Sequence, residues 1–378
     1  MNGTLAQGSD TEALVQFIGV EKSYDGRSLA VRDLTLDVRR GEFLTLLGPS
    51  GSGKTTTLNM LAGFERPTRG EILLGGRPVD RLPPYDRNIG MVFQNYALFP
   101  HMTVSENVAF PLSVRRMPRA DIADRVKRAL AMVQLEAFGD RRPAQLSGGQ
   151  QQRIALARAL VFEPSLVLMD EPLGALDKKL REQLQIEIKL LHERLGLTVV
   201  YVTHDQSEAL TMSDRIAVFH EGRVVQEGTP DVLYMQPRDA FVAGFIGENN
   251  MLSGTVAAIA DGHVRVALAD GPEVVATAVG DLEHGAQVLV AVRPEVIRVS
   301  ADPAGGDNAC RAVVISHIYF GDHQRLLTEI GTGHRVTVKV PADAAAVAGQ
   351  SIFLCWNVED CRAFPASAAV EASLEQQT

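Results

Sequence analysis

FLTLLGPSGSGKTT, residues 43–56, runs from five mostly apolar positions straight into a turn of small residues that ends in lysine and threonine. The apolar run predicts a buried strand, and TLNMLA, residues 57–62, predicts the helix that follows. In this context the turn predicts a phosphate-binding loop; the alternative is a glycine-rich turn with an unrelated lysine. We expect its backbone N–H groups to surround β-phosphate oxygens, Lys54 to reach the β- and γ-phosphates, and the Thr55 hydroxyl to ligate Mg²⁺. The predicted ATP contacts are Gly48, Pro49, Ser50, Gly51, Ser52, Gly53, Lys54, Thr55 and Thr56.

A second apolar run ends in two acidic residues. Leu166-Val-Leu-Met169 predicts a buried strand of a parallel sheet, and Asp170 and Glu171 follow it directly. At the carboxyl end of such a strand, Asp170 is placed to hold Mg²⁺ and Glu171 to polarise the attacking water. An acidic pair alone is also typical of an ordinary turn, but together with the loop it favours a catalytic site.

A third apolar strand, expected from Thr198, ends in His204. A single histidine at a strand end is more often a hydrogen-bonded structural residue than a catalytic one. Because this strand should end at the sheet edge that holds the phosphates, we interpret His204 as a γ-phosphate contact.

LSGGQQQR, residues 146–153, is a second turn suited to an anion. Ser147 can cap the helix that follows, Gly148 and Gly149 allow close approach of another molecule, and a helix N-terminus favours negative charge. One nucleotide needs only one phosphate-binding loop, so the turn raises the question of which nucleotide it serves.

Two styles of sequence indicate two domains. Residues 12 to about 235 combine alternating segments, such as Leu34–Val38, with continuous apolar runs, which predicts an α/β core with an antiparallel flap. Short alternating strands after residue 250 predict a small all-β domain. The expected boundaries are 12–245 for the first domain, with a helical subdomain at about 95–160, 246–366 for the second, and 367–378 for a frayed tail.

Composition excludes several classes of protein. The net charge of −9 argues against a general nucleic-acid binder, because phosphate-backbone affinity requires clustered basic residues. No apolar run approaches the roughly 18 residues that span a bilayer, and the start of the chain has no features of a secretion signal. Cys310, Cys355 and Cys361 have no metal-ligand spacing, which predicts structural or idle thiols in a reducing cytoplasm.

The motifs and their order resemble those of the nucleotide-binding subunit of ATP-binding-cassette (ABC) transporters over about residues 12–245. The resemblance implies a P-loop NTPase fold with a RecA-like core. It also implies that Tyr24 stacks on adenine and that Gln94 senses Mg²⁺ and the catalytic water. Leu173-Gly-Ala-Leu-Asp177 resembles the loop that crosses the dimer interface of this family.

The same resemblance gives the second turn a role. In this family two subunits pack head to tail, and each ATP lies between the Lys54 loop of one chain and the signature turn of the other. The residues expected to act in trans are Ser147, Gly148, Gly149 and Gln150. ATP and Mg²⁺ then join two copies of the chain, which close on two ATPs and reopen after hydrolysis.

The family's partner is a membrane permease, whose coupling helix is received near Gln94. Tyr96 and Phe99, close by, are equally compatible with an exposed docking surface and with a buried core. Val292-Arg-Pro-Glu295 and its neighbouring strands resemble the TOBE domain, an oligonucleotide-binding (OB)-like β fold appended to ATPases of sugar, polyamine and iron importers. We expect this domain to serve dimerisation or regulation, with no role in binding nucleic acid.

The expected function is therefore the ATP-hydrolysing motor of a bacterial importer, peripheral on the cytoplasmic face of the inner membrane and served indirectly by a periplasmic solute-binding protein. Phe245–Gly254 and Tyr319–His323 look most like the polyamine group, although they also suit a domain junction and a β-turn. The alternatives are iron or sugar uptake by the same motor, or a soluble ABC ATPase without a transport role.

Overall fold

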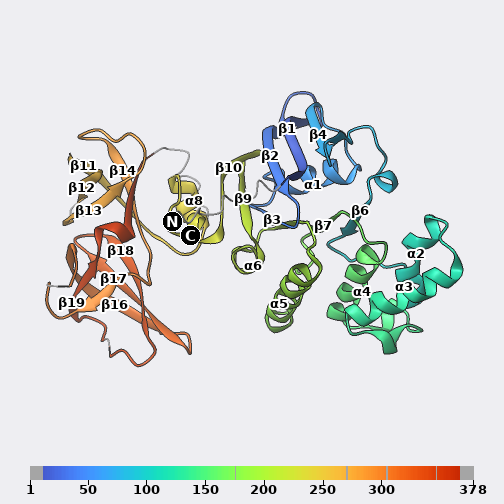
Figure 1. Cartoon of the computed structure of the whole chain (residues 1–378). Helices are drawn as coiled ribbons and strands as arrows, with labels where there is room; N and C mark the ends of the chain where they lie inside the picture. Colours follow the sequence, from blue (N-terminus) through green and yellow to red (C-terminus); the bar gives the residue numbers. More distant parts are fainter. Residues whose placement is uncertain (1–11, 175, 270, 304, 346, 367–378) are drawn as a thin grey trace, which may run out of the picture. The chain divides into compact units, whose positions relative to one another are not determined.

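The computed structural model describes residues 12–174, 176–269, 271–303, 305–345 and 347–366, and its chain divides into two compact units, Met1–Pro230 and Asp231–Thr378 (Figure 1). The predicted tail at 367–378 lies outside the described residues. No helix in the described ranges is long and apolar enough to cross a membrane.

A six-stranded sheet forms the centre of the first unit. Its order is β10 (Arg223–Gly228), β9 (Arg215–His220), β3 (Phe43–Leu47), β8 (Val199–Thr203), β7 (Leu166–Asp170) and β6 (Ile89–Val92). All neighbouring strands are parallel except β10, which pairs antiparallel with β9. Because parallel strands end at one edge, the sheet brings the ends of β3, β7 and β8 together, as the sequence predicts.

Both faces of this sheet are buried, which explains the continuous apolar runs. Leu166 and Leu168 of β7 pack into a core with α1 (Lys54–Ala62) and an antiparallel sheet. Val167 and Met169 face the other way, into a core with α4 (Gly148–Leu160), α5 (Lys178–Leu195) and α6 (Gln206–Met212). The antiparallel sheet has the order β2 (Leu29–Arg39), β1 (Ala13–Ser23), β4 (Arg69–Leu74) and β5 (Arg77–Pro78).

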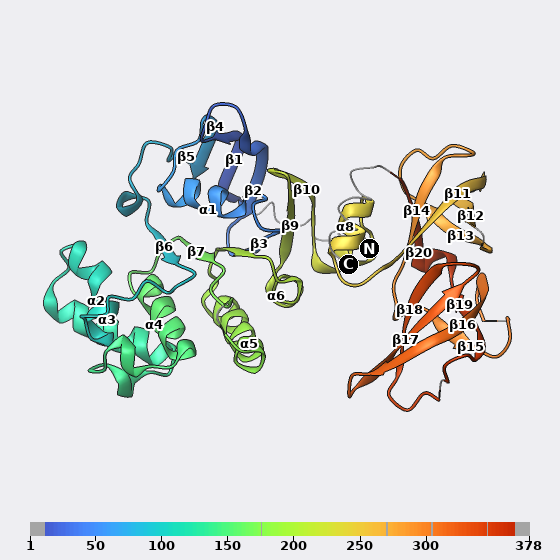
Figure 2. The same cartoon turned by 180° about the vertical axis from the view of Figure 1, so that it is seen from behind.

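A helical region is inserted between β6 and β7. Its long helices are α2 (Val104–Val114), α3 (Arg119–Met132) and α4, and Figure 2 shows them grouped beside the central sheet. Val126, Ala129 and Leu130 of α3 lie in the core of this group, as their helical spacing predicts. Single 3₁₀ turns occur at Pro84–Asp86, Glu136–Phe138 and Pro143–Gln145.

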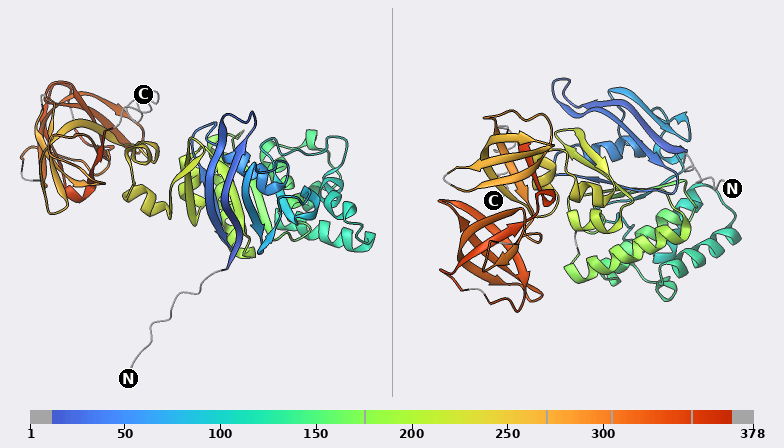
Figure 3. Two further views of the ribbon diagram at one scale, coloured as in Figure 1. Left: turned by 90° about the horizontal axis from the view of Figure 1, so that it is seen from above. Right: turned by 60° about the vertical axis from the view of Figure 1, so that its left-hand side comes forward.

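In its described residues the second unit is all-β apart from α7 (Pro230–Met235), at its start, α8 (Ala240–Phe245) and a 3₁₀ turn at Val358–Asp360 (Figure 3). A closed five-stranded barrel contains β11 (Asn250–Ala260), β12 (His263–Leu268), β13 (Glu273–Ala278), β20 (Cys361–Pro365) and β14 (Gln287–Val292). A second sheet has the order β15 (Arg298–Ser300), β19 (Ser351–Trp356), β16 (Asn308–Tyr319), β17 (His323–Ile330) and β18 (His334–Pro341). The predicted class, an α/β P-loop NTPase core followed by an OB-like β domain, is confirmed.

Two details add to the sequence analysis. The sequence assigns α8 to the first domain, whereas α8 clusters with the second unit because Ala240 and Ala243 pack against Leu289 and Ala291 of β14.

The three cysteines of the second unit, Cys310, Cys355 and Cys361, form no disulfide and are buried.

Candidate functional site

The loop between β3 and α1 requires its glycines for two different reasons. Gly51 and Gly53 have φ angles of +78° and +101°, a region that side chains with a Cβ rarely adopt. At Gly48 a Cβ atom would lie 2.3 Å from the backbone oxygen of Phe219. The loop therefore wraps tightly over the ends of β3 and β9.

Lys54 is buried beneath this loop, with 4% of its surface exposed. Its ammonium group donates hydrogen bonds to the backbone oxygens of Gly48, at 2.7 Å, and Pro49, at 2.8 Å. Burial lowers the pKa of Lys54, and the charges of Glu171 and Asp170 act in the opposite direction. The loop's own carbonyl oxygens therefore hold the cation, and the charges of the two acids act on it.

Asp170 and Thr55 form the second part of the site. The Thr55 hydroxyl donates to a carboxylate oxygen of Asp170 at 3.1 Å. Burial raises the pKa of Asp170, with a further contribution from the charge of Glu171, against the effects of Thr55 and Lys54. A desolvated carboxylate beside a hydroxyl is the hard oxygen donor set that suits Mg²⁺.

The three predicted catalytic side chains meet at Glu171. The Gln94 amide donates to one of its carboxylate oxygens at 3.2 Å, and Nδ1 of His204 lies 3.1 Å from the other. The backbone N–H of Glu171 is bonded to the carbonyl of Val202 in β8, which fixes the carboxylate at the sheet edge. These contacts place Gln94, Glu171 and His204 in one cluster next to the Lys54 loop.

Tyr24 follows β1 and lies near the same loop. Its hydroxyl is 3.4 Å from that of Thr56, and the ammonium of Lys22 lies 4.9 Å from the ring centroid. The side chain of Lys22 is in turn held by Glu65 at 2.7 Å. With 63% of its surface exposed, the Tyr24 ring is available to stack against a flat ligand.

The second turn is built as a helix cap. The Ser147 hydroxyl accepts from the N–H of Gln150 at 3.4 Å, and the Gln150 side chain accepts from the N–H of Ser147 at 3.0 Å. A Cβ on Gly148 would meet the Leu176 side chain at 3.2 Å, and one on Gly149 would meet Leu180 at 3.0 Å. The turn thus packs against the start of α5 within its own chain.

Asp177 caps α5 by accepting from the N–H of Leu180 at 3.0 Å. The loop that contains it therefore leads directly into the helix on which the second turn packs. The sequence does not indicate this packing, because Leu176 and Leu180 read as ordinary core positions.

Tyr96 and Phe99 differ in exposure. Tyr96 is 7% exposed and belongs to the core shared with α4 and α5, so of the two readings that the sequence leaves open, the buried one holds. Phe99 is half-buried and contacts Phe110 at a centroid distance of 4.6 Å. Arg158 donates to the backbone oxygens of Tyr96 and Ala97, both at 2.7 Å.

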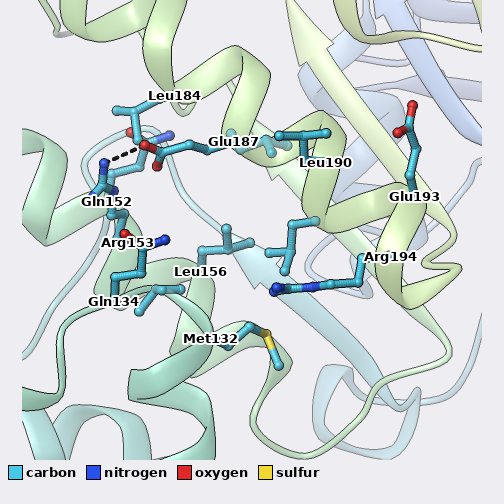
Figure 4. Close-up of a pocket in the computed structure, with 13 residues that line it drawn as sticks. Met132, Gln134, Gln152, Arg153, Leu156, Leu184, Glu187, Leu190, Glu193 and Arg194 are labelled. Atoms are coloured by element: carbon cyan, nitrogen blue, oxygen red, sulfur yellow. Dashed lines mark hydrogen bonds and ion pairs between the residues drawn. The ribbon is translucent and has the colours of Figure 1, made fainter.

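A cavity of about 550 Å³ lies elsewhere in the first unit, among α3, α4 and α5 (Figure 4). Arg153 and Glu187 point toward each other there and form an ion pair at 2.7 Å. None of the residues predicted to bind nucleotide lines this cavity, which is therefore distinct from the phosphate-binding loop.

Two family models and curated relatives match this chain. Residues 31–174 match the ABC transporter family and residues 290–364 match the TOBE domain. The spermidine/putrescine import ATP-binding protein PotA of Rubrobacter xylanophilus is 48% identical over 89% of this chain and 90% of its own length. The protein of the same name from Acidothermus cellulolyticus is 49% identical over 92% of each chain. The chain belongs to the ABC transporter family. The resemblance identified from the sequence is confirmed.

Solved structures of ABC proteins match more than half of the chain. A dimeric ATP-binding cassette in a post-hydrolysis state bound to ADP and Pi is 38% identical, with a TM-score of 0.52 over 57% of this chain and 98% of its own. The cbiO1 protein of Clostridium perfringens, part of an ABC transporter complex, is 29% identical, with a TM-score of 0.56 over 59% of this chain and 91% of its own.

Proposed function

We propose that this protein is the ATP-hydrolysing motor subunit of an ABC importer for polyamines. The observation that carries the proposal is the position of Glu171, held between Gln94 and His204, with its charge acting on the buried ammonium of Lys54. A carboxylate at this place can polarise water near a bound γ-phosphate, and Lys54 can balance phosphate charge. The names of the relatives, import ATP-binding proteins, support the same function.

With ATP bound, phosphate oxygens would replace the backbone oxygens of Gly48 and Pro49 as acceptors for the Lys54 ammonium. Backbone N–H groups of the loop at residues 50–56 would bind the phosphates, and the exposed Tyr24 ring would stack on adenine. Mg²⁺ would be held by Thr55, Asp170 and Gln94, of which the first two already share a hydrogen bond. Bound there, the ion would neutralise charge on the phosphate oxygens.

Hydrolysis follows from the groups around Glu171. Glu171 draws a proton from water, the water oxygen attacks the γ-phosphorus, and the bond from that phosphorus to the bridging oxygen breaks to leave ADP and phosphate. Gln94 orients the water and His204 contacts the γ-phosphate, while each also holds the Glu171 carboxylate in place.

The second turn completes the site of another copy of the chain. Ser147, Gly148, Gly149 and Gln150 present a capped helix N-terminus, which suits a γ-phosphate. Two chains packed head to tail would then enclose two ATPs, with Asp177 at their interface. The dimeric state of the solved cassette bound to ADP and Pi supports a dimer as the working form.

The motor would act on a membrane permease, received near Gln94 and the helical region, with a periplasmic solute-binding protein acting indirectly. The protein would then lie on the cytoplasmic face of the inner membrane, attached through the permease. The TOBE domain would hold or regulate the dimer.

Polyamine is the solute that the relatives' names favour, since both are spermidine/putrescine import proteins. The test is ATP hydrolysis by the protein reconstituted with its permease and binding protein. We expect stimulation by spermidine or putrescine and none by maltose or ferric iron. Stimulation by a sugar or iron, with both polyamines silent, would overturn the polyamine assignment and leave the motor function standing.

A further inference from the structure

We propose that Arg181 is a positioning residue that joins Leu176, which packs against the second turn, to the His204 segment, so that the second turn and the hydrolytic cluster of one chain move together. This inference rests on the proposed ATPase function. Arg181 lies in the first turn of α5, directly after the loop that Asp177 closes.

The guanidinium of Arg181 spans two segments that are distant in sequence. One of its terminal nitrogens donates to the backbone oxygen of Leu176 at 3.0 Å, and the other donates to the carboxylate of Asp205 at 3.1 Å. The group is mostly buried, with 28% of the side chain exposed, so the ion pair is partly shielded from water. Arginine suits this task because its planar fork presents two donors in fixed geometry.

Asp205 is itself held firmly, which makes it a good anchor. Its other carboxylate oxygen accepts from the N–H of Ser207 at 2.8 Å and from the Ser207 hydroxyl at 2.6 Å. Its backbone N–H donates to Thr203 at 3.0 Å. His204 lies between Thr203 and Asp205 in the chain. Arg181 therefore acts on the segment from which His204 reaches Glu171.

Glu208 provides a second acceptor for the same guanidinium. The Tyr201 and Thr203 hydroxyls donate to one oxygen of this buried carboxylate, at 2.8 and 2.7 Å. The other oxygen lies 4.0 Å from Nε of Arg181. That nitrogen is buried and makes no hydrogen bond within the described part of the chain. Arg181 therefore faces two carboxylates of the His204 segment, and its removal would leave both without their cation.

The opposite end of the connection reaches the second turn. Gly148 and Gly149 pack against the side chains of Leu176 and Leu180, and Leu176 supplies the carbonyl that Arg181 binds. A displacement of the turn by a nucleotide on the partner chain would thus be transmitted through Leu176 and Arg181 to Asp205. The cluster at Glu171 would sense whether the other half-site is filled.

The test is steady-state ATP hydrolysis by the full chain with Arg181→Gln, alongside binding of a non-hydrolysable ATP analogue and thermal unfolding. We expect kcat to fall by about 10- to 100-fold, because catalysis is sensitive to small misplacement of reacting groups. KM and the affinity for the analogue should stay within about twofold of wild type, since Arg181 is not among the predicted ATP contacts. Arg181→Lys, which keeps the charge without the fork, should recover part of kcat.

Arg194→Gln is the matched control, because it removes the same charge from the exposed end of the same helix. It should retain wild-type kcat. If Arg181→Gln stayed folded and either kept kcat within about twofold or lost analogue affinity together with activity, the positioning role would be overturned. If Arg181→Gln is too unstable to assay, Arg181→Lys decides: a lowered kcat with wild-type analogue affinity supports the inference, and a wild-type kcat or a joint loss of affinity and kcat overturns it. Absence of hydrolysis by the wild-type chain would overturn the proposed function itself, and this inference with it.

Discussion

Alanine substitutions in the phosphate-binding loop can separate the two reasons for its glycines. Gly51→Ala adds only backbone strain, because φ is +78° and nothing lies within 4 Å of the new Cβ. Gly48→Ala adds only a clash, with the Phe219 carbonyl at 2.3 Å. Gly53→Ala adds both, with φ at +101° and the Ala30 carbonyl at 2.5 Å.

The expected free-energy costs follow from these differences. A left-handed backbone costs a residue with a Cβ about 1–2 kcal/mol, and overpacking a well-filled site costs about 1–3 kcal/mol. Gly53→Ala should therefore cost about 2–5 kcal/mol in total, as weaker ATP binding, a lower free energy of unfolding, or both. Each loss of about 1.4 kcal/mol in binding raises the Kd for ATP tenfold. Titration with a non-hydrolysable ATP analogue and thermal unfolding measure the two shares. If Gly53→Ala matched Gly51→Ala in both, the clash argument would be refuted.

Two further predictions concern the dimer and the β domain. Mixed dimers of Ser147→Arg and Lys54→Ala chains contain one intact composite site, so they should regain ATPase activity that neither variant shows alone; verified mixed dimers without activity would contradict the trans arrangement. Burial raises the pKa of Cys361 to about 12, from 9.0. The folded state then holds the proton more tightly, so the free energy of unfolding should fall as pH rises from about 9 to about 12 and be unaffected by this thiol below about 9. Chemical unfolding of wild type and Cys361→Ala between about pH 9 and about pH 12 measures this dependence. Identical slopes of the free energy of unfolding against pH for the two proteins would contradict the prediction.

The sequence predicts most of the first unit because its strands are buried on both faces. The runs ending at Leu47 and Asp170 and the strand before His204 leave no polar side for solvent, so both their type and their common edge could be inferred. Their ends then place Lys54, Asp170, Glu171 and His204 together.

Other features depend on contacts without a local sequence signal. A side chain is excluded at Gly48 by the backbone oxygen of Phe219. Any residue type at position 219 would present the same oxygen, so the sequence carries no signal of this contact. Arg181 reads as one more charge on an amphipathic helix, and only the fold shows that Asp205 and the Leu176 carbonyl face it. The association of α8 with the second unit likewise depends on which strand its small residues meet.

The proposal that Glu171 activates water at an ATP shared by two chains is tested most directly by Glu171→Gln. The amide keeps the size of the carboxylate but cannot accept the proton of water. We predict that ATP turnover is nearly abolished while ATP is still bound, so that an ATP-dependent dimer is seen by size-exclusion chromatography. Turnover near the wild-type rate, or a chain that stays monomeric with ATP bound, would contradict the account.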